Sequence, residues 1–357
     1  MSKFSEIARR LVPAVCDVSV TNVCNAACDF CLFARDKQVV RDRFWVDRDR
    51  LAEALPILYR RGIRYINFQG GEPLMHRAID WLVQDAKTAG MQPTLITNGW
   101  LLPDKIERLI AAGLSTLIVS IDSHSMTEHE RNRGLPGVGE RIRQSLAIAR
   151  KHGVPRLASV TVNRLVRYDA LPELLRDLGF SSAVFSYPRW KPLRSSSLSY
   201  NEHSRLIDFN SAELVRDLEA IKSLNELFPV WNATASIDDV ERYVHDEVQM
   251  FPCVGGYKYF YLDWNLDIWR CEAWPKPLGS VFDLDRIKDC RDPCTACMMT
   301  CYRNSSTLMH AAVAISDALM VAARGRLAEA ARLIFRRSVA LSLGAVAGKL
   351  RQISRLA

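Results

Sequence analysis

The chain has 357 residues, 48% of them hydrophobic, and a formal net charge of +8 at pH 7. This length leaves room for one large α/β domain and a smaller appendage in a folded globular protein. Residues 308–357 hold eight Lys or Arg and two Asp or Glu, so most of the positive excess lies in this tail. The remainder is nearly neutral, which argues against a nucleic-acid-binding body.

The ten cysteines lie in two groups, one near the start of the chain and one after residue 250. They are Cys16, Cys24, Cys28, Cys31, Cys253, Cys271, Cys290, Cys294, Cys297 and Cys301. Such grouping is typical of metal ligation in a reducing compartment rather than of a disulfide scaffold. The first residues lack a secretory signal, and we find no apolar stretch of 18 residues, so a cytoplasmic location is expected.

Short β-branched runs alternate with amphipathic helical segments up to about residue 188. The expected strands are Cys16–Thr21, Ile63–Gln69, Gln92–Thr97, Thr116–Asp122, Leu157–Asn163 and Ala183–Tyr187. The expected helices are Asp47–Arg60, Arg77–Ala89, Pro103–Ala112, Gly137–His152 and Ala170–Leu178, several of them followed by a glycine stop. Six such units predict an α/β fold, a partial (β/α)6 TIM-like barrel with its chemistry at the carboxyl ends of the strands.

The rest of the chain divides into three further segments. A Ser-rich break at residues 191–199 places the first boundary near residue 200, so the barrel covers 1–200. A helical connector, with a helix from about Glu202 to Leu227, is expected over 201–250. A small Cys-rich, aromatic domain follows at 251–304, and a basic amphipathic helical tail at 305–357.

The first cysteine group follows the first strand as CNAACDFC, with Cys24, Cys28 and Cys31 on one loop. Three thiolates on a loop hold three irons of a cubane and leave the fourth iron open, whereas an electron-transfer cluster usually has four protein ligands. A zinc site is the alternative, but it needs a fourth ligand nearby, and the nearest following histidine is His76.

The spacing of these three cysteines resembles the radical S-adenosylmethionine (radical SAM) superfamily. The resemblance implies a 4Fe-4S cluster whose open iron binds S-adenosylmethionine, and its reductive cleavage to methionine and a 5′-deoxyadenosyl radical that abstracts hydrogen from an organic substrate. Phe30 stands where the superfamily packs an aromatic ring beside the adenine. The implied partners are a substrate and an electron donor such as flavodoxin or ferredoxin.

Two further motifs agree with the resemblance. Gly70, Gly71 and Glu72 resemble the superfamily's GGE motif, whose backbone meets the methionine amino group, and glycine permits that approach. A plain strand-to-helix turn is the alternative for this segment. Asn98 ends the third strand at a position that contacts the cofactor in many members.

Later strand ends supply four more expected cofactor contacts. Ser120 and Asp122 end the fourth strand, although a Ser-x-Asp sequence is also a common helix cap. Arg133 resembles the arginine that binds the cofactor carboxylate, with Arg131 as its rival. Asn163 ends the fifth strand, where it either binds a ribose hydroxyl or serves as a turn residue.

The second cysteine group contains a predicted β-hairpin between Cys253 and Cys271, with its turn near Asn265. Four cysteines then follow within twelve residues, at positions 290, 294, 297 and 301, and this density indicates a metal site. The pattern resembles the SPASM and shortened twitch auxiliary-cluster modules. This resemblance implies one auxiliary 4Fe-4S cluster, with ligands Cys253, Cys271, Cys294 and Cys297, and Cys301 as a rival for the last place. Cys16 and Cys290 are read as ordinary buried thiols.

The tail carries arginines around apolar helical faces, with Leu327, Ala331, Ile334 and Phe335 on one face. Such a helix either lies peripherally on an anionic inner membrane face or packs on the barrel or a second subunit. A membrane-associated lipid or isoprenoid is therefore the favoured substrate. A small alcohol or cyclitol dehydrogenase of the twitch type, a peptide maturase and a non-enzymatic iron-sulfur electron carrier are the alternatives.

Overall fold

The computed structural model describes residues 12–36, 42–188, 204–295 and 297–356. Its centre is a nine-stranded sheet with the strand order β6-β5-β4-β3-β2-β1-β7-β8-β9. The first six strands are β1 (Ala14–Ser19), β2 (Ile63–Gln69), β3 (Gln92–Thr97), β4 (Thr116–Ile121), β5 (Arg156–Thr161) and β6 (Ser182–Ser186). All are parallel, and each pairs with the next in sequence. The partial barrel is thereby confirmed, and the strand ends lie within two residues of the expected ones.

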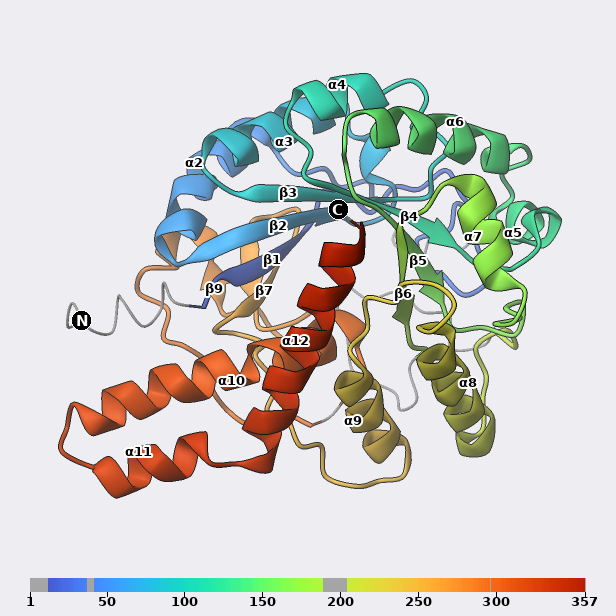
Figure 1. Ribbon diagram of the computed structural model, residues 1–357. Coiled ribbons are helices and arrows are strands. Elements are labelled where there is room, and N and C mark those ends of the chain that lie inside the picture. The colour runs from blue at the N-terminus through green and yellow to red at the C-terminus, as the bar shows by residue number, and fades with distance from the viewer. Residues whose placement is uncertain (1–11, 37–41, 189–203, 296, 357) are drawn as a thin grey trace.

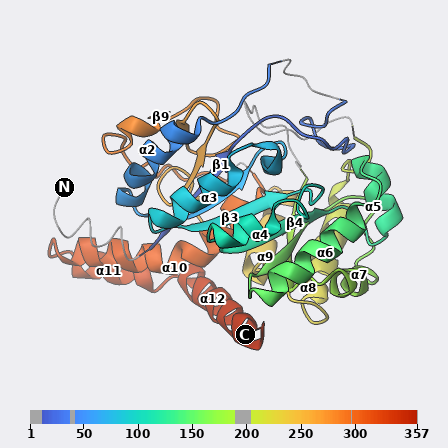
Figure 2. The same cartoon turned by 90° about the horizontal axis from the view of Figure 1, so that it is seen from above.

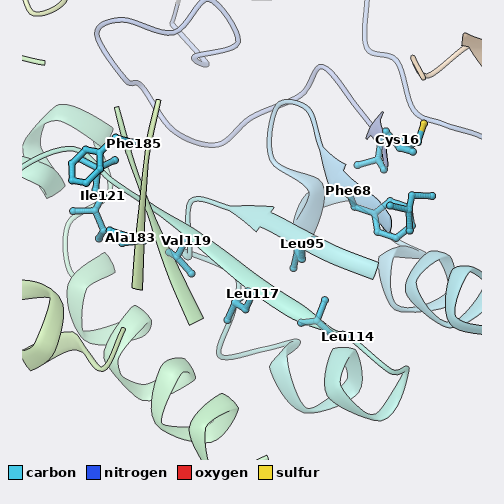
Figure 3. Packing of buried hydrophobic residues seen from close by; sticks show 14 of the residues in the cluster. Cys16, Phe68, Leu95, Leu114, Leu117, Val119, Ile121, Ala183 and Phe185 are labelled. Carbon is cyan, nitrogen blue, oxygen red and sulfur yellow. The ribbon is translucent and has the colours of Figure 1, made fainter. Parts of the chain in front are cut away.

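Helices follow these strands and cover the convex face of the curved sheet (Figure 1). They are α2 (Arg48–Arg60), α3 (Ile79–Thr88), α4 (Ile106–Ala111), α5 (Met126–Arg133), α6 (Val138–Lys151) and α7 (Leu171–Leu178), with the short 3-10 helix η1 (Pro73–Met75) after β2. Their apolar sides pack on the strands in one large core, part of which Figure 3 shows around Phe68, Leu95 and Leu117. Burial of this apolar surface is the main stabilising contribution.

One barrel helix, α5, is missing from the sequence prediction. Its sequence, MTEHERNR, is polar on all sides and has no apolar period, so periodicity does not reveal it. The residues that it buries are the polar His129 and Arg133. Gly134, at φ 59°, ends it in the left-handed conformation that glycine adopts without strain.

The Cys-rich segment does not form a separate layer. Its strand β7 (Tyr259–Leu262) pairs in parallel with β1, and β8 (Asp267–Trp269) and β9 (Gly279–Ser280) continue the sheet in antiparallel fashion. The predicted hairpin is present, and Leu266 at φ 65° stands in its turn beside Asn265. The short η2 helix (Val281–Asp283) follows β9. The second cysteine group is thus attached directly to the edge of the barrel at β1.

The remaining helices are α8 (Ser211–Leu224), α9 (Thr234–Val244), α10 (Thr300–Ala322), α11 (Leu327–Ile334) and α12 (Arg337–Leu356). The expected connector helix begins later than predicted, at Ser211, because Asn210 and Glu213 form a capping box there. The Ser-rich break at 191–199, on which the boundary near residue 200 depends, lies outside the described residues. Figures 1 and 2 show α10, α11 and α12 projecting together from the barrel.

Helix α10 corrects one expectation. It is 23 residues long and apolar enough to cross a membrane by length and composition, so the chain does contain an apolar stretch of 18 residues. Its first half is nevertheless part of the folded body, because Arg303 is 1% exposed and forms a buried ion pair with Asp239 of α9. About a third of its most apolar window is buried.

Candidate functional site

The first cysteine loop leaves β1 and is held in place by α5. Ala27 donates its backbone N–H to the Arg133 carbonyl at 2.8 Å, and Ala26 donates to Cys24 Sγ at 3.4 Å. Both contacts fix the loop backbone, so Cys24, Cys28 and Cys31 all line one cavity of about 220 Å³ at the carboxyl ends of the strands. The sequence prediction that these thiols share one site is consistent with this placement.

The surroundings of these thiols disfavour their ionisation when no metal is bound. Burial, the nearby Glu72 carboxylate and Cys31 raise the pKa of Cys24 to about 12, and burial likewise raises the pKa of Cys28 and Cys31. Cys28 is buried and Cys24 and Cys31 are half-buried, so their thiolates need a compensating cation such as iron. Within the described ranges no three His, Cys, Asp or Glu side chains are arranged to share one metal ion. A cubane needs no such group, because each thiolate binds a different iron.

Gly70 and Gly71 hold the second strand end against the cysteine loop. Gly71 donates its N–H to the Thr21 carbonyl at 2.7 Å, and a Cβ on Gly71 would lie 2.3 Å from the Val23 oxygen. Gly70, at φ 129°, has equally little room, since a Cβ would lie 2.3 Å from the Thr21 oxygen. Glycine is therefore required here for close backbone approach. Both glycines line the cavity.

Glu72 does not line the cavity but organises its wall. It is fully buried, and its carboxylate accepts hydrogen bonds from the Thr97 hydroxyl at 2.6 Å and the Asn98 N–H at 2.7 Å. The Asn98 side-chain amide in turn donates to Asn25 Oδ1 at 2.8 Å, and Asn98 lines the cavity. The GGE segment thus ties the ends of β1, β2 and β3 together.

Arg133 is the cation of the cavity. It is 7% exposed, lines the cavity and donates from Nη2 to Asp122 Oδ1 at 2.6 Å. Although burial opposes the charge, Asp122 raises the pKa of Arg133, so the guanidinium stays charged. Its Nε is buried and has no hydrogen-bond partner in the described part of the chain. This free donor fits a carboxylate ligand, whereas the rival Arg131 is exposed and lies away from this cavity.

Phe30 and Ser120 line the cavity as expected, but Asp122 and Asn163 do not. The Asp122 carboxylate is fully buried and is occupied by Arg133 and Asn132. The Asn163 amide donates to the Asp122 and Thr161 carbonyls and accepts from the Leu165 N–H, which is the turn-residue alternative. Both side chains therefore position the site rather than face its interior.

The second cysteine group lies beyond β7. Burial and then the Cys294 charge raise the pKa of Cys253 despite nearby hydrogen-bond and arginine contributions. Burial, and then the charges of Cys297 and Cys253, raise the pKa of Cys271. Burial is also the main cause that raises the pKa of Cys297 to about 12. These mutual effects indicate that the four predicted ligands lie near one another, with Cys253 buried and the other three half-buried. Four thiols are a donor set that fits an iron-sulfur cluster.

The other three cysteines have different surroundings. Cys301 is half-buried, and after burial the nearby Glu272 and Asp17 carboxylates raise its pKa most. A thiol facing two acids is a poor candidate for ionisation, which favours Cys297 over Cys301 as a ligand. Cys290 contacts Arg270 and Asp292. Cys16 is fully buried in the barrel core, as an ordinary thiol would be.

Further residues line the cavity without having been predicted from the sequence, among them Ser19, Phe33, Gln69, Ile96, Thr161, Tyr261 and Glu272. Ser19, Gln69 and Thr161 end strands, which is the same positional signal that selects Asn98 and Ser120. Tyr261 and Glu272 could not be found in this way, because only the pairing of β7 with β1 brings them to the cavity.

The comparisons with known proteins agree with this site. Residues 18–178 match the family described as the Radical SAM superfamily. The chain is 29% identical over 208 residues to an AdoMet-dependent heme synthase of Methanosarcina barkeri (strain Fusaro / DSM 804), covering 56% of this chain and 58% of that protein. It is 33% identical over 172 residues to a GTP 3′,8-cyclase of Stenotrophomonas maltophilia (strain R551-3), covering 46% of this chain and 52% of that protein. The chain thus spans about half the length of the curated relatives that it matches.

The fold is also that of solved structures. Streptococcus suis SuiB bound to S-adenosylmethionine superimposes with a TM-score of 0.59 at 16% identity, over 78% of this chain and 67% of that one. At this identity the likeness concerns the fold alone. The partial barrel, with three cysteines at its carboxyl end, defines a radical SAM domain. With the family match, residues 18–178 form a radical SAM domain, and the members of this superfamily are enzymes.

Proposed function

We propose that this protein reductively cleaves S-adenosylmethionine at a 4Fe-4S cluster and abstracts hydrogen from an organic substrate. The observation that carries the proposal is one cavity lined by Cys24, Cys28 and Cys31 together with the buried cation Arg133. When bound, the cluster supplies the electron that cleaves the sulfonium and yields the 5′-deoxyadenosyl radical. A reduced flavodoxin or ferredoxin is the proposed electron donor.

In this proposal the residues of the chain hold the cofactor and exclude water. Arg133, kept charged by Asp122, binds the methionine carboxylate through donors such as its free Nε. The backbone at Gly70 and Gly71 meets the amino group, and Phe30 packs beside the adenine. The buried Glu72 keeps the loops after β1, β2 and β3 at fixed spacing, so the cavity is preorganised.

The proposed substrate side of the cavity is the wall where the segment after β8 meets the end of β2. Glu272 is 6% exposed, accepts a hydrogen bond from Gln69 Nε2 at 2.7 Å and directly follows Cys271. A carboxylate and an amide on this wall suit a substrate with a hydroxyl or amino group. The adjacent second cluster would accept or supply an electron. A membrane-associated lipid or isoprenoid bearing such a group is the favoured class, and a small alcohol or cyclitol is the alternative.

A peptide substrate is a second candidate. SuiB, whose fold is similar to that of this chain with a TM-score of 0.55, has also been solved bound to a precursor peptide, SuiA. Because the shared identity is only 16%, the similarity concerns the barrel and not the substrate.

The proposal is tested by anaerobic reconstitution followed by measurement of 5′-deoxyadenosine after addition of dithionite and S-adenosylmethionine. Formation of 5′-deoxyadenosine supports the chemistry, and its absence in fully reconstituted protein contradicts it. The substrate class is then sought as an increase above the substrate-free rate with polar lipid extract, a set of cyclitols or a set of peptides. An increase with only one of these assigns the class.

A further inference from the structure

The tail helices α11 and α12 expose their apolar residues to solvent. On α11, Leu327 is 69% exposed, and Phe335, the residue after the helix, is 87% exposed. Leu327, Ala331 and Phe335 follow one another at helical spacing and are all exposed, whereas Ala330 is buried and Leu333 half-buried. A surface helix of a globular protein normally buries its large apolar residues, so the exposure of Leu327 and Phe335 is unusual.

Helix α12 also exposes large apolar residues. Leu343 and Leu350 are 51% and 62% exposed. On the inner side, the Ser342 hydroxyl donates to the Thr307 carbonyl at 2.6 Å, and the Lys349 ammonium donates to the Val230 carbonyl at 2.5 Å. Burial lowers the pKa of Lys349 to about 8. Val339 of α12 packs inward on Ala311 and Ala314 of α10, whereas Leu343 and Leu350 remain exposed.

Positive charge surrounds this apolar surface. Arg332, Arg336 and Arg337 are exposed beside Phe335, and Glu329 is the only acidic residue from 318 to 357 in the sequence. Glu329 is itself paired with Arg326. The surface therefore combines large exposed apolar side chains with an excess of cations, the combination by which a helix binds in the interface of an anionic bilayer.

We propose that the outward faces of α11 and α12, which we call the tail surface, dock on an anionic lipid membrane. The tail surface comprises Leu327, Phe335, Leu343 and Leu350 together with Arg332, Arg336 and Arg337. A second copy of the chain is a poorer partner, because a symmetric contact would place the arginines of both copies against each other. Membrane docking is an addition to the proposed function. It rests on the proposed function only in so far as the favoured substrate is a membrane-associated lipid.

The tail surface is remote from the cavity. Both views show α11 and the segment that carries the first cysteine loop on opposite sides of the molecule (Figures 1 and 2). Substitutions on the tail surface therefore leave the cofactor site intact. Docking holds the enzyme at the membrane and does not form part of the cavity.

The test is cosedimentation of the reconstituted full-length protein with vesicles of phosphatidylcholine, alone or mixed with phosphatidylglycerol. We expect binding only to the mixed vesicles, with weakening by added salt. The Leu327→Ser, Phe335→Ser double variant should bind at least about tenfold more weakly, because it removes two inserted side chains. Its control is Leu227→Ser, which removes a leucine that is 60% exposed elsewhere. The Arg332→Gln, Arg336→Gln, Arg337→Gln variant should lose the preference for phosphatidylglycerol, with Arg286→Gln as its control.

Two results would overturn the proposal: wild-type protein that stays in the supernatant with mixed vesicles, or a double variant that binds as the wild type does. A wild-type dimer in analytical ultracentrifugation that the Phe335→Ser change dissociates, without vesicle binding, would assign the surface to a second copy instead. Cleavage of S-adenosylmethionine is measured in parallel. Its absence in the wild type would contradict the proposed function and leave the vesicle result standing.

Discussion

Gln69 donates a hydrogen bond to Glu272 Oε1 at 2.7 Å, between residues that lie 203 positions apart in the sequence. Gln69 ends β2 immediately before the GGE motif, and Glu272 directly follows Cys271 of the second cysteine group. Both line the cavity. The residue that follows Cys271 thus shares the wall of the cavity that the first cysteine group lines.

Replacing Glu272 tests this shared wall. Glu272→Gln should retain iron and S-adenosylmethionine binding but raise the midpoint potential of the second cluster, because losing a nearby negative charge favours the reduced form. A redox titration followed by electron paramagnetic resonance measures the potential, with the exposed Glu53→Gln as control. An unchanged midpoint potential would mean that the Glu272 charge does not act on the second cluster.

Arg133 is expected to dominate cofactor affinity. Arg133→Met should weaken S-adenosylmethionine binding about 10- to 100-fold, since a hydrogen bond to a charged group is worth about 1.5–3 kcal/mol. Calorimetry on the reconstituted protein measures this, and Arg131→Met, at an exposed position, is the control. Because Arg133→Met leaves the Asp122 charge buried, the Arg133→Met, Asp122→Asn double variant supplies a neutral reference. Wild-type affinity in both would remove Arg133 from the cofactor site.

The sequence predicts the parts of the site that depend on local order. The alternation of strands and helices is enough to place the three cysteines of one loop near Asn98 and Ser120, which end strands. Glu272 reaches the cavity only because β7 pairs with β1. In that pairing the Tyr259 hydroxyl of β7 donates a hydrogen bond to Asp17 of β1, 242 residues away in the sequence. No local pattern contains that pairing. Asp122 illustrates a second limit, because position in the chain does not tell which strand-end side chains turn away from the cavity.

Stability should depend on pH through His129. Burial outweighs the Asp122 charge and lowers the pKa of His129 to about 4, below its usual value of about 6.5. Between these values the unfolded chain binds more protons, so stability should fall as the pH falls from about 6.5 to about 4. In the wild type, His129 Nδ1 accepts a hydrogen bond from the Asp122 N–H at 3.1 Å. The His129→Asn variant keeps an acceptor there but does not titrate, so urea unfolding should show a weaker dependence of stability on pH. A slope equal to that of the wild type would mean that His129 is not the group responsible.

Gly71 should be needed for the first cluster rather than for the fold. Gly71→Ala places a Cβ 2.3 Å from the Val23 oxygen, which displaces the cysteine loop. Iron content should fall from about eight toward about four per chain while helical circular dichroism is kept. Gly348→Ala, which meets open space, is the control. Full iron in the Gly71→Ala protein would show that the loop tolerates the displacement.

The second cluster should depend on Cys297 and not on Cys301. Cys297→Ala should lose about four irons, whereas Cys301→Ala should keep about eight, because the Cys301 thiol faces the Asp17 and Glu272 carboxylates. Iron analysis and the spectrum of the reduced protein distinguish the two variants. Loss of iron in the Cys301→Ala protein but not in the Cys297→Ala protein would mean that Cys301, and not Cys297, is the ligand.

The central claim is tested most directly by comparing wild type and Cys28→Ala after anaerobic reconstitution, with iron counted and 5′-deoxyadenosine measured after dithionite and S-adenosylmethionine. We predict about eight irons and 5′-deoxyadenosine from the wild type, and about four irons and none from Cys28→Ala, with Cys16→Ala behaving as the wild type. Formation of 5′-deoxyadenosine by Cys28→Ala at the wild-type rate would contradict the account.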